Sequence, residues 1–82
     1  MKLEVWKDIE SYPNYQVSNF GSIKSKERYT KVKDNQLVQR KEKLLKQLVD
    51  TKGYHYVRLY NDKGFKNIKV HRLVANAFIV NF

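Results

Sequence analysis

Few side chains in this sequence could catalyse a reaction. The two histidines, His55 and His71, are sixteen positions apart, and no Asp or Glu converges with them at the spacing of a metal site. There is no cysteine, which excludes a thiol nucleophile, a disulfide framework and a cysteine-based zinc site. We therefore predict no catalytic residue, metal or cofactor here. We expect His55 to be half-buried, and His71 to be structural or to contact a phosphate.

The chemistry that the sequence favours is the binding of a polyanion. Seventeen Lys and Arg residues against eight Asp and Glu residues give the 82-residue chain a net charge of +9. Nucleic acid is the most common partner of so basic a domain, ahead of a membrane surface. The length allows one small core. No apolar run is long enough to span a membrane, and the charged N-terminal residues predict no signal peptide.

Two alternating stretches predict the β-hairpins that would position these cations. In the first, residues 15–18 and 22–25 pair across a turn at 19–21 that ends in glycine, which favours the positive φ of such a turn. Val17 then faces Ile23, and Tyr15 faces Ser25, on a mostly apolar side. The other side is polar and carries Gln16, Ser18, Ser22 and Lys24.

The second predicted hairpin pairs residues 54–60 with 65–70 across a turn at 61–64. Burial of one face specifies the register, with Val57 facing Ile68 and His55 facing Val70 on the core side. The exposed side would carry Arg58 opposite Asn67, Tyr56 opposite Lys69, and Tyr54 beyond them. This exposed side mixes cations with aromatic rings.

The remaining segments are a basic stretch between the hairpins and a C-terminal helix. Residues 28–33 alternate like a strand, and 34–36 form a predicted turn. The leucines of 37–49 fit a helical stripe or a short strand at 45–49, because periodicity does not decide short apolar runs. A helix over 71–79 would bury Leu73, Val74, Ala77 and Phe78 on one side. The elements predict an α+β domain of antiparallel hairpins with a short helix packed across them.

Two blocks of this sequence resemble a known family. Residues 4–9, 15–21 and 23–25 resemble the NUMOD4 motif, the N-terminal DNA-binding element of phage and intron-encoded HNH homing endonucleases. Residues 53–59 and 70–79 resemble the segment that leads into the HNH nuclease core. The likeness is weakest over 28–43. It implies one NUMOD4-like DNA-binding domain over 1–82, with 53–82 as the lead-in to an HNH core, and it favours a strand over a helix at 45–49.

The resemblance also implies how the domain works. In that family the antiparallel sheet lies along the DNA groove, and a following ββα-metal unit cuts the phosphodiester. That unit would lie beyond Phe82, so a divalent metal such as Mg²⁺ would belong to the part that is missing here. Val80 and Phe82 stand where proline is usual in the family. The expected location is the cytoplasm of a bacterial or phage-infected host cell.

Ten residues are the candidate DNA contacts. Phosphate contacts position a protein, whereas base-edge contacts specify sequence. Suitable groups for base edges are on Gln16, Lys24, Arg58 and Asn67. The full set is Gln16, Ser18, Lys24, Lys26, Arg28, Lys31, Lys33, Arg58, Asn67 and Lys69. Weaker candidates are Arg40, Lys41, Lys43 and Lys46. The alternative is that the lysines only protect a solvated edge strand.

The aromatic residues, together with Leu73, divide into two predicted groups. We expect Trp6, Tyr15, Phe20, Leu73 and Phe78 in the core, and an exposed position for Tyr54, Tyr56 and Tyr60 that also suits stacking on single-stranded bases. Our main hypothesis is a protein that binds double-stranded DNA without cutting it. Three alternatives stay open. These are an HNH nuclease with its catalytic half elsewhere, a single-strand or RNA-binding module, and a homodimer formed through Leu73, Val74, Phe78 and Ile79.

Overall fold

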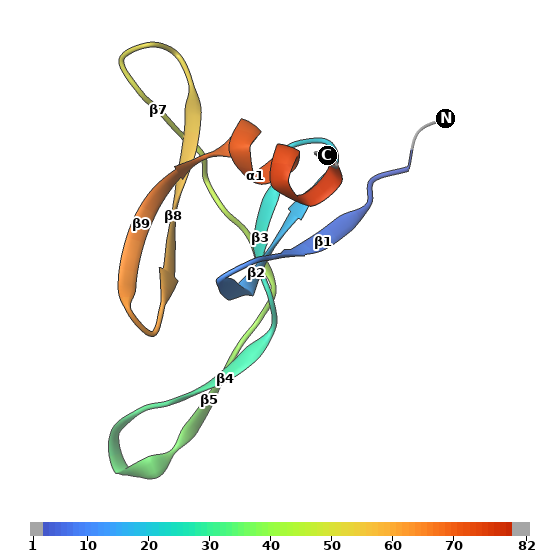
Figure 1. The fold of residues 1–82 in the computed structure, drawn as a ribbon. Coiled ribbons are helices and arrows are strands. Elements are labelled where there is room, and N and C mark those ends of the chain that lie inside the picture. Colours follow the sequence, from blue (N-terminus) through green and yellow to red (C-terminus); the bar gives the residue numbers. More distant parts are fainter. Residues whose placement is uncertain (1–2, 80–82) are drawn as a thin grey trace.

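The computed structural model describes residues 3–79, which form three small antiparallel sheets and one α-helix. Figure 1 shows the short helix (red) packed against the sheets and a thin hairpin (green) that extends away from them at the bottom. The predicted α+β fold is confirmed. No helix in the described range is long and apolar enough to cross a membrane.

Sheet A contains the first predicted hairpin and two further strands. Its order is β1 (Trp6–Ile9), β2 (Tyr12–Ser18), β3 (Ile23–Ser25) and β6 (Lys43–Leu44). The predicted register is confirmed, because Val17 pairs with Ile23. Gly21 has a φ of +86°, which glycine adopts without steric cost, so the turn forms as expected. Strand β1 was not predicted.

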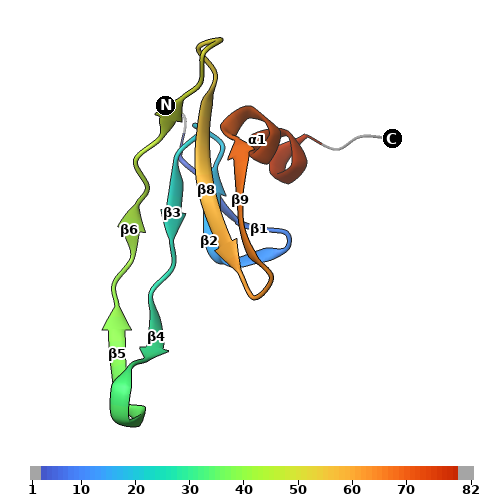
Figure 2. The same ribbon diagram turned by 90° about the vertical axis from the view of Figure 1, so that its left-hand side faces the viewer.

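The segment between the hairpins is a second antiparallel pair. Strand β4 (Arg28–Lys31) and strand β5 (Leu37–Arg40) form sheet B and are joined through the short 3₁₀ helix η1 (Lys33–Asn35). The strand expected at 28–33 is present but ends at Lys31, and the turn expected at 34–36 lies at 33–35. The helical alternative for residues 37–49 is wrong, and of the strand expected at 45–49 only Leu48–Val49 forms. The two strands pack mainly on each other, and Figure 2 shows them as an arm that extends β3 and β6.

The register shows that this arm and the β3–β6 pair are one ribbon. Lys24 pairs with Leu44, Arg28 with Arg40, and Lys31 with Leu37. In every pair the two residue numbers add to the same total, which means that each step forward on one strand is matched by one step back on the other. The register is therefore continuous across the break at 26–27 and 41–42. We call residues 23–31 together with 37–44 the ribbon.

Sheet C contains the second predicted hairpin. Its strands are β7 (Leu48–Val49), β8 (His55–Asn61) and β9 (Gly64–Lys69). The predicted pairs are confirmed from Tyr60 with Phe65 to Tyr56 with Lys69. The expected strand end is wrong, because Val70 begins the helix and His55 pairs with Val49 instead. His55 consequently lies beyond the core and is exposed, not half-buried.

Helix α1 (Val70–Phe78) covers a core shared by sheets A and C. The buried core residues are Ile9, Tyr15, Val17, Ile23, Val57, Leu59, Val70 and Leu73. The predicted helix is confirmed, with its start one residue earlier. Val74 and Phe78 pack against the core, so the face expected to mediate self-association is turned inward, and Ile79 alone of those four residues is exposed.

The four aromatic residues and Leu73 that were expected in the core differ in their burial. Tyr15 and Leu73 are buried, whereas Trp6 and Phe78 are half-buried. Phe20 is 54% exposed, so its predicted core position is wrong. It lies in the turn between β2 and β3, where the chain reverses before the side chain can reach the core. The predicted exposure of Tyr54 and Tyr60 is correct, and Tyr56 is half-buried.

Candidate nucleic-acid interface

One face of the ribbon collects four of the cations that the sequence singled out. Alternate residues of a strand point to the same side, so Lys24, Lys26 and Arg28 share a face with Arg40 on the partner strand. Gln16 joins them, because it pairs with Lys24 across β2 and β3. We call these five residues the ribbon face. Ile23, on the opposite side of the same strand, is buried in the core and so fixes which side faces outward.

Two cations of the ribbon face have carboxylate partners. The Lys24 ammonium lies 2.9 Å from Glu42 and 4.3 Å from the centroid of the Trp6 ring. The Lys26 ammonium lies 3.3 Å from Asp8. The Lys26–Asp8 pair is exposed, and such pairs are worth only about 0–1 kcal/mol, so a phosphate can replace Asp8 at little cost. The Lys24 side chain is only 16% exposed, and its ammonium reaches the surface beside Glu42, which is 58% exposed.

Asp8 links the first strand of sheet A to the ribbon face. Its carboxylate accepts a hydrogen bond from the Gln16 amide at 2.8 Å as well as the contact from Lys26. The Gln16 hydrogen bond, followed by the Lys26 hydrogen bond and charge, lowers the pKa of Asp8 below its usual value. Asp8 is therefore ionised at neutral pH and holds both side chains on the face.

The middle of the ribbon face carries two arginines directly opposite each other. Arg28 pairs with Arg40 across β4 and β5. Directly opposed like charges destabilise an antiparallel pair. The Arg40 guanidinium donates to the Thr30 hydroxyl at 3.3 Å, and no carboxylate bridges either arginine among the described residues. The pair concentrates positive charge on an arm that has no other layer beneath it.

The other basic residues of the arm lie away from this face. Lys31 points to the opposite side of the ribbon, and Lys33 lies in the 3₁₀ turn at its tip. Lys43 also falls on the opposite side, since it pairs with Ser25. All three are exposed. They surround the arm with positive charge without forming part of the ribbon face.

The predicted position of Ser18 is wrong. Its side chain has no exposed surface, and its hydroxyl accepts the backbone N–H groups of Phe20 and Ser22, each at 3.1 Å. Strand alternation placed Ser18 on the polar side, but β2 ends there and the side chain turns in to hold the turn. Ser18 is thus a structural residue of the hairpin and cannot contact a ligand in this conformation.

The remaining three candidates form a separate group on sheet C. Arg58 and Asn67 pair across β8 and β9, and the Arg58 Nε donates to the Asn67 Oδ1 at 3.1 Å. The Lys69 ammonium lies 4.8 Å from the centroid of the Tyr54 ring. The ring of His71 lies 5.5 Å from the same tyrosine, and His71 is exposed. These side chains are on their own sheet and do not extend the ribbon face.

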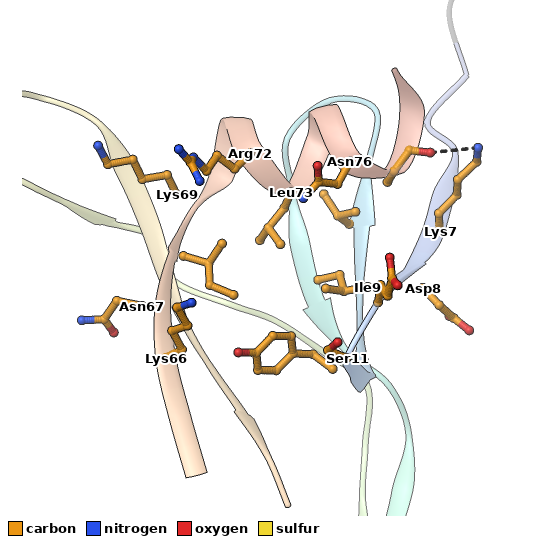
Figure 3. A pocket seen from close by; sticks show the side chains of 15 residues that line it. Lys7, Asp8, Ile9, Ser11, Lys66, Asn67, Lys69, Arg72, Leu73 and Asn76 are labelled. Carbon is orange, nitrogen blue, oxygen red and sulfur yellow. Dashed lines mark hydrogen bonds between the residues drawn. The ribbon is translucent and has the colours of Figure 1, made fainter. Parts of the chain in front are cut away.

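A pocket of about 830 Å³ lies between β1, β9 and α1. Figure 3 shows Lys66, Lys69 and Arg72 on one side of it and Lys7 and Asp8 on the other. The Lys7 ammonium donates to the Ala77 carbonyl at 3.1 Å, where a cation is favoured by the partial negative charge of a helix C-terminus. Lys7 thus ties the end of α1 to β1. No group of three His, Asp or Glu side chains that could hold a metal is found within residues 3–79.

Sequence reasoning missed three parts of the interface. It did not pair Arg28 with Arg40, did not assign Asp8 and Glu42 as partners of the lysines, and did not place Trp6 beneath Lys24. The alternation of residues 28–31 signalled a strand, but nothing in the charged segment fixes a register. Asp8 and Trp6 lie on strand β1, which was also missed, and Glu42 depends on the register of the ribbon.

Comparisons with known proteins give the chain its family. Residues 4–60 match the NUMOD4 motif. The chain is 38% identical over 74 residues to DNA endonuclease I-HmuI of Bacillus phage SP01, which covers 89% of this chain and 35% of that protein. It is 35% identical over 78 residues to H-N-H endonuclease F-TflII of Escherichia phage T5, which covers 95% of this chain and 34% of that protein.

A solved structure has the same fold. It is described as DNA binding and cleavage by the HNH homing endonuclease I-HmuI, and it matches with a TM-score of 0.70 at 35% identity over 95% of this chain and 38% of that one. The chain therefore spans about a third of the length of these relatives. The motif match runs from β1 nearly to the end of β8 and includes the whole ribbon. The chain belongs to the NUMOD4 motif family.

Proposed function

We propose that this chain binds double-stranded DNA through the ribbon face and does not cut it alone. The observation that carries the proposal is the opposed pair of Arg28 and Arg40 at the middle of that face. A protein retains such a repulsive pair at little cost when a phosphate lies between the two guanidinium groups, because each group then donates to an anion. Both relatives carry the name endonuclease, and the matching structure concerns DNA binding.

The shape of the ribbon supports duplex DNA as the partner. A two-stranded β-ribbon fits the major groove, which is about 12 Å wide. Lys24, Lys26 and the two arginines would contact phosphates and set the position of the protein. Gln16 supplies a side-chain amide to the ribbon face. This amide would reach a base edge after its hydrogen bond to Asp8 is broken. Lys31 and Lys33 at the tip would meet the neighbouring strand of the duplex.

The proposal that these residues do not cut rests on the side chains present. Hydrolysis of a phosphodiester in this family needs a metal to stabilise charge on the phosphate and a base to activate water. The two histidines are exposed on different elements, and neither has a carboxylate partner among the described hydrogen bonds and ion pairs. Catalytic residues would be supplied by the two-thirds of the relatives that this chain does not cover, and a divalent metal would belong there.

Fluorescence anisotropy on a labelled duplex of about 25 base pairs tests the binding. This duplex is longer than the 46 Å protein, since each base pair adds about 3.4 Å. We expect an affinity that falls linearly with salt on logarithmic axes. Absence of binding at low salt would overturn the proposal.

A denaturing gel of the same samples with and without Mg²⁺ tests the second part. We expect intact strands in both cases. Nicks that need Mg²⁺ would show that these residues contain a catalytic site after all. Fractions of the protein across a gel-filtration peak then tell whether any nicking belongs to this chain or to a contaminating nuclease, because activity of this chain must follow its concentration.

A further inference from the structure

The outer face of sheet C carries aromatic rings that nothing in the described structure covers. Alternate residues of β8 and β9 point to this side, away from buried Val57 and Leu59. Phe65 is 60% exposed, Tyr60 is 52% exposed, and Tyr54 just before β8 is 47% exposed. The face consists of Tyr54, Tyr56, Arg58, Tyr60, Phe65, Asn67 and Lys69. We call it the aromatic face.

The cations of the aromatic face lie against the rings. The Arg58 guanidinium is 4.5 Å from the centroid of the Phe65 ring, and its Nε is fixed by Asn67. The Lys69 ammonium is 4.8 Å from the Tyr54 ring, at the other end of the face. Tyr60 and Phe65 are neighbours, with ring centroids 5.7 Å apart. Positive charge is therefore interleaved with exposed rings along the sheet.

This combination fits one kind of ligand better than others. No Asp or Glu stands in strands β8 or β9, and Asp50 lies near Lys69 at one end of the face only. A partner that approaches the rest of this face meets rings, the Asn67 amide and positive charge. An apolar protein surface would bury Arg58 and Lys69 without compensation, which is costly. A strand of nucleotides supplies both complements, because its bases stack on aromatic rings and its phosphates pair with the cations.

We propose that the aromatic face binds unpaired nucleotides of a single-stranded nucleic acid by base stacking. Residues on one side of an antiparallel strand repeat about every 6.8 Å, and stacked bases in a strand repeat about every 3.4 Å. One base therefore fits between rings two positions apart along the chain, as Tyr54 and Tyr56 are. Tyr60 and Phe65 already contact each other and would stack a base on their outer sides. Bases in an intact duplex are stacked on each other and do not offer their faces, so this site differs from the ribbon face in the form of nucleic acid that it binds.

Anisotropy with labelled oligo(dT) of about 12 nucleotides tests the proposal, since single-strand sites span about 4–16 nucleotides. The matched ligand is an abasic strand of the same length, which keeps the phosphates and lacks the bases. We expect the 82-residue chain to bind oligo(dT) at least about fivefold more tightly than the abasic strand. Equal affinity for the two strands would show that only phosphates are bound and would overturn the proposal.

Variants of the rings show where the bases bind. Phe65→Ala should weaken oligo(dT) binding by at least about fivefold and leave abasic-strand and duplex binding unchanged. Phe65→Leu keeps an apolar side chain without the ring and should weaken oligo(dT) binding in the same direction. Tyr29→Ala is the control, because Tyr29 is 65% exposed but lies on the arm. The assignment would be overturned if Tyr29→Ala weakened oligo(dT) binding while Phe65→Leu left it unchanged.

The two proposals fail in different ways. Loss of duplex binding in ribbon-face variants with oligo(dT) binding retained confirms that the sites are separate. If Phe65→Leu weakens duplex and oligo(dT) binding equally, the aromatic face is part of the duplex interface and the single-strand proposal is wrong. If the chain forms a dimer in sedimentation and Phe65→Leu dissociates it without changing oligo(dT) affinity, the face binds protein and the proposal is also wrong.

Discussion

Replacing the opposed arginines by glutamine should weaken DNA binding and stabilise the fold at the same time. Arg28 and Arg40 face each other across β4 and β5, and neither contacts the core. Opposed like charges destabilise an antiparallel pair, whereas neutral pairs do not, so Arg28→Gln is expected to raise the free energy of unfolding by about 0.2–1 kcal/mol. If the arginine pair served only to stabilise the fold, Arg28→Gln would instead lower the free energy of unfolding.

The effect on binding follows from the number of cations on the ribbon face. Lys24, Lys26, Arg28 and Arg40 are four potential phosphate contacts, and each contributes about −0.9 to the slope of log affinity against log salt. The ribbon face should therefore contribute about −3.6 to the slope, which is a loss of about 150-fold between about 50 and 200 mM salt, and contacts from Lys31 and Lys33 at the tip add to it. Replacing both arginines should reduce the ribbon-face contribution to about −1.8, a loss of about 12-fold over the same range, and leave the contribution of the tip unchanged.

The assay is duplex anisotropy in a salt series, together with urea denaturation of the same proteins. The matched control replaces Lys52 and Lys63 by glutamine, which removes the same charge from turns of sheet C and should leave the slope nearly unchanged. An equal drop in slope for both double variants would refute the argument, because it would mean that net charge matters and the ribbon face does not. A loss of stability in the arginine variant would refute the repulsion on which the argument depends.

Three further changes test other parts of the structure. Glu42→Gln should tighten duplex binding in the anisotropy assay, because it removes the carboxylate that competes with phosphate for Lys24. Weaker binding would show that Glu42 instead orients that lysine. Ser18→Ala should lower the free energy of unfolding by about 1–3 kcal/mol, since two turn amides lose their buried acceptor; unchanged urea denaturation would contradict this. The lowered pKa of Asp8 means that its contribution to stability is complete above about pH 3.9 and is lost as the pH falls through the folded-state value. The Asp8→Asn variant should therefore lose less free energy of unfolding than the wild type as the pH is lowered. Equal losses in the two proteins would refute the stabilising role assigned to Asp8.

The hairpins were predictable because burial specifies their register. Val17 with Ile23 and Val57 with Ile68 are apolar pairs beside a glycine turn, and a shift by one residue would expose all four. The ribbon carries no such constraint. Its paired residues at Arg28 and Arg40 are charged, so several registers suit the sequence equally well and only the full structure selects one.

Each error has an identifiable physical cause. His55 was expected against Val70, but Val70 starts the helix and leaves the end of β8 without that partner. Strand β1 was missed because Trp6 and Ile9 are its only apolar residues, and they are too few for an alternating pattern. Its place depends on backbone pairing with β2, which is a long-range effect that a local pattern does not contain.

The most direct test of the central claim is an NMR titration of the labelled 82-residue chain with duplex DNA at low salt. The ribbon-face account predicts that the largest amide shift changes fall in residues 24–30 and 38–44, while the turn residues 51–53 and 62–63 of sheet C change little. Shift changes concentrated in sheet C or α1, with the ribbon unaffected, would contradict it.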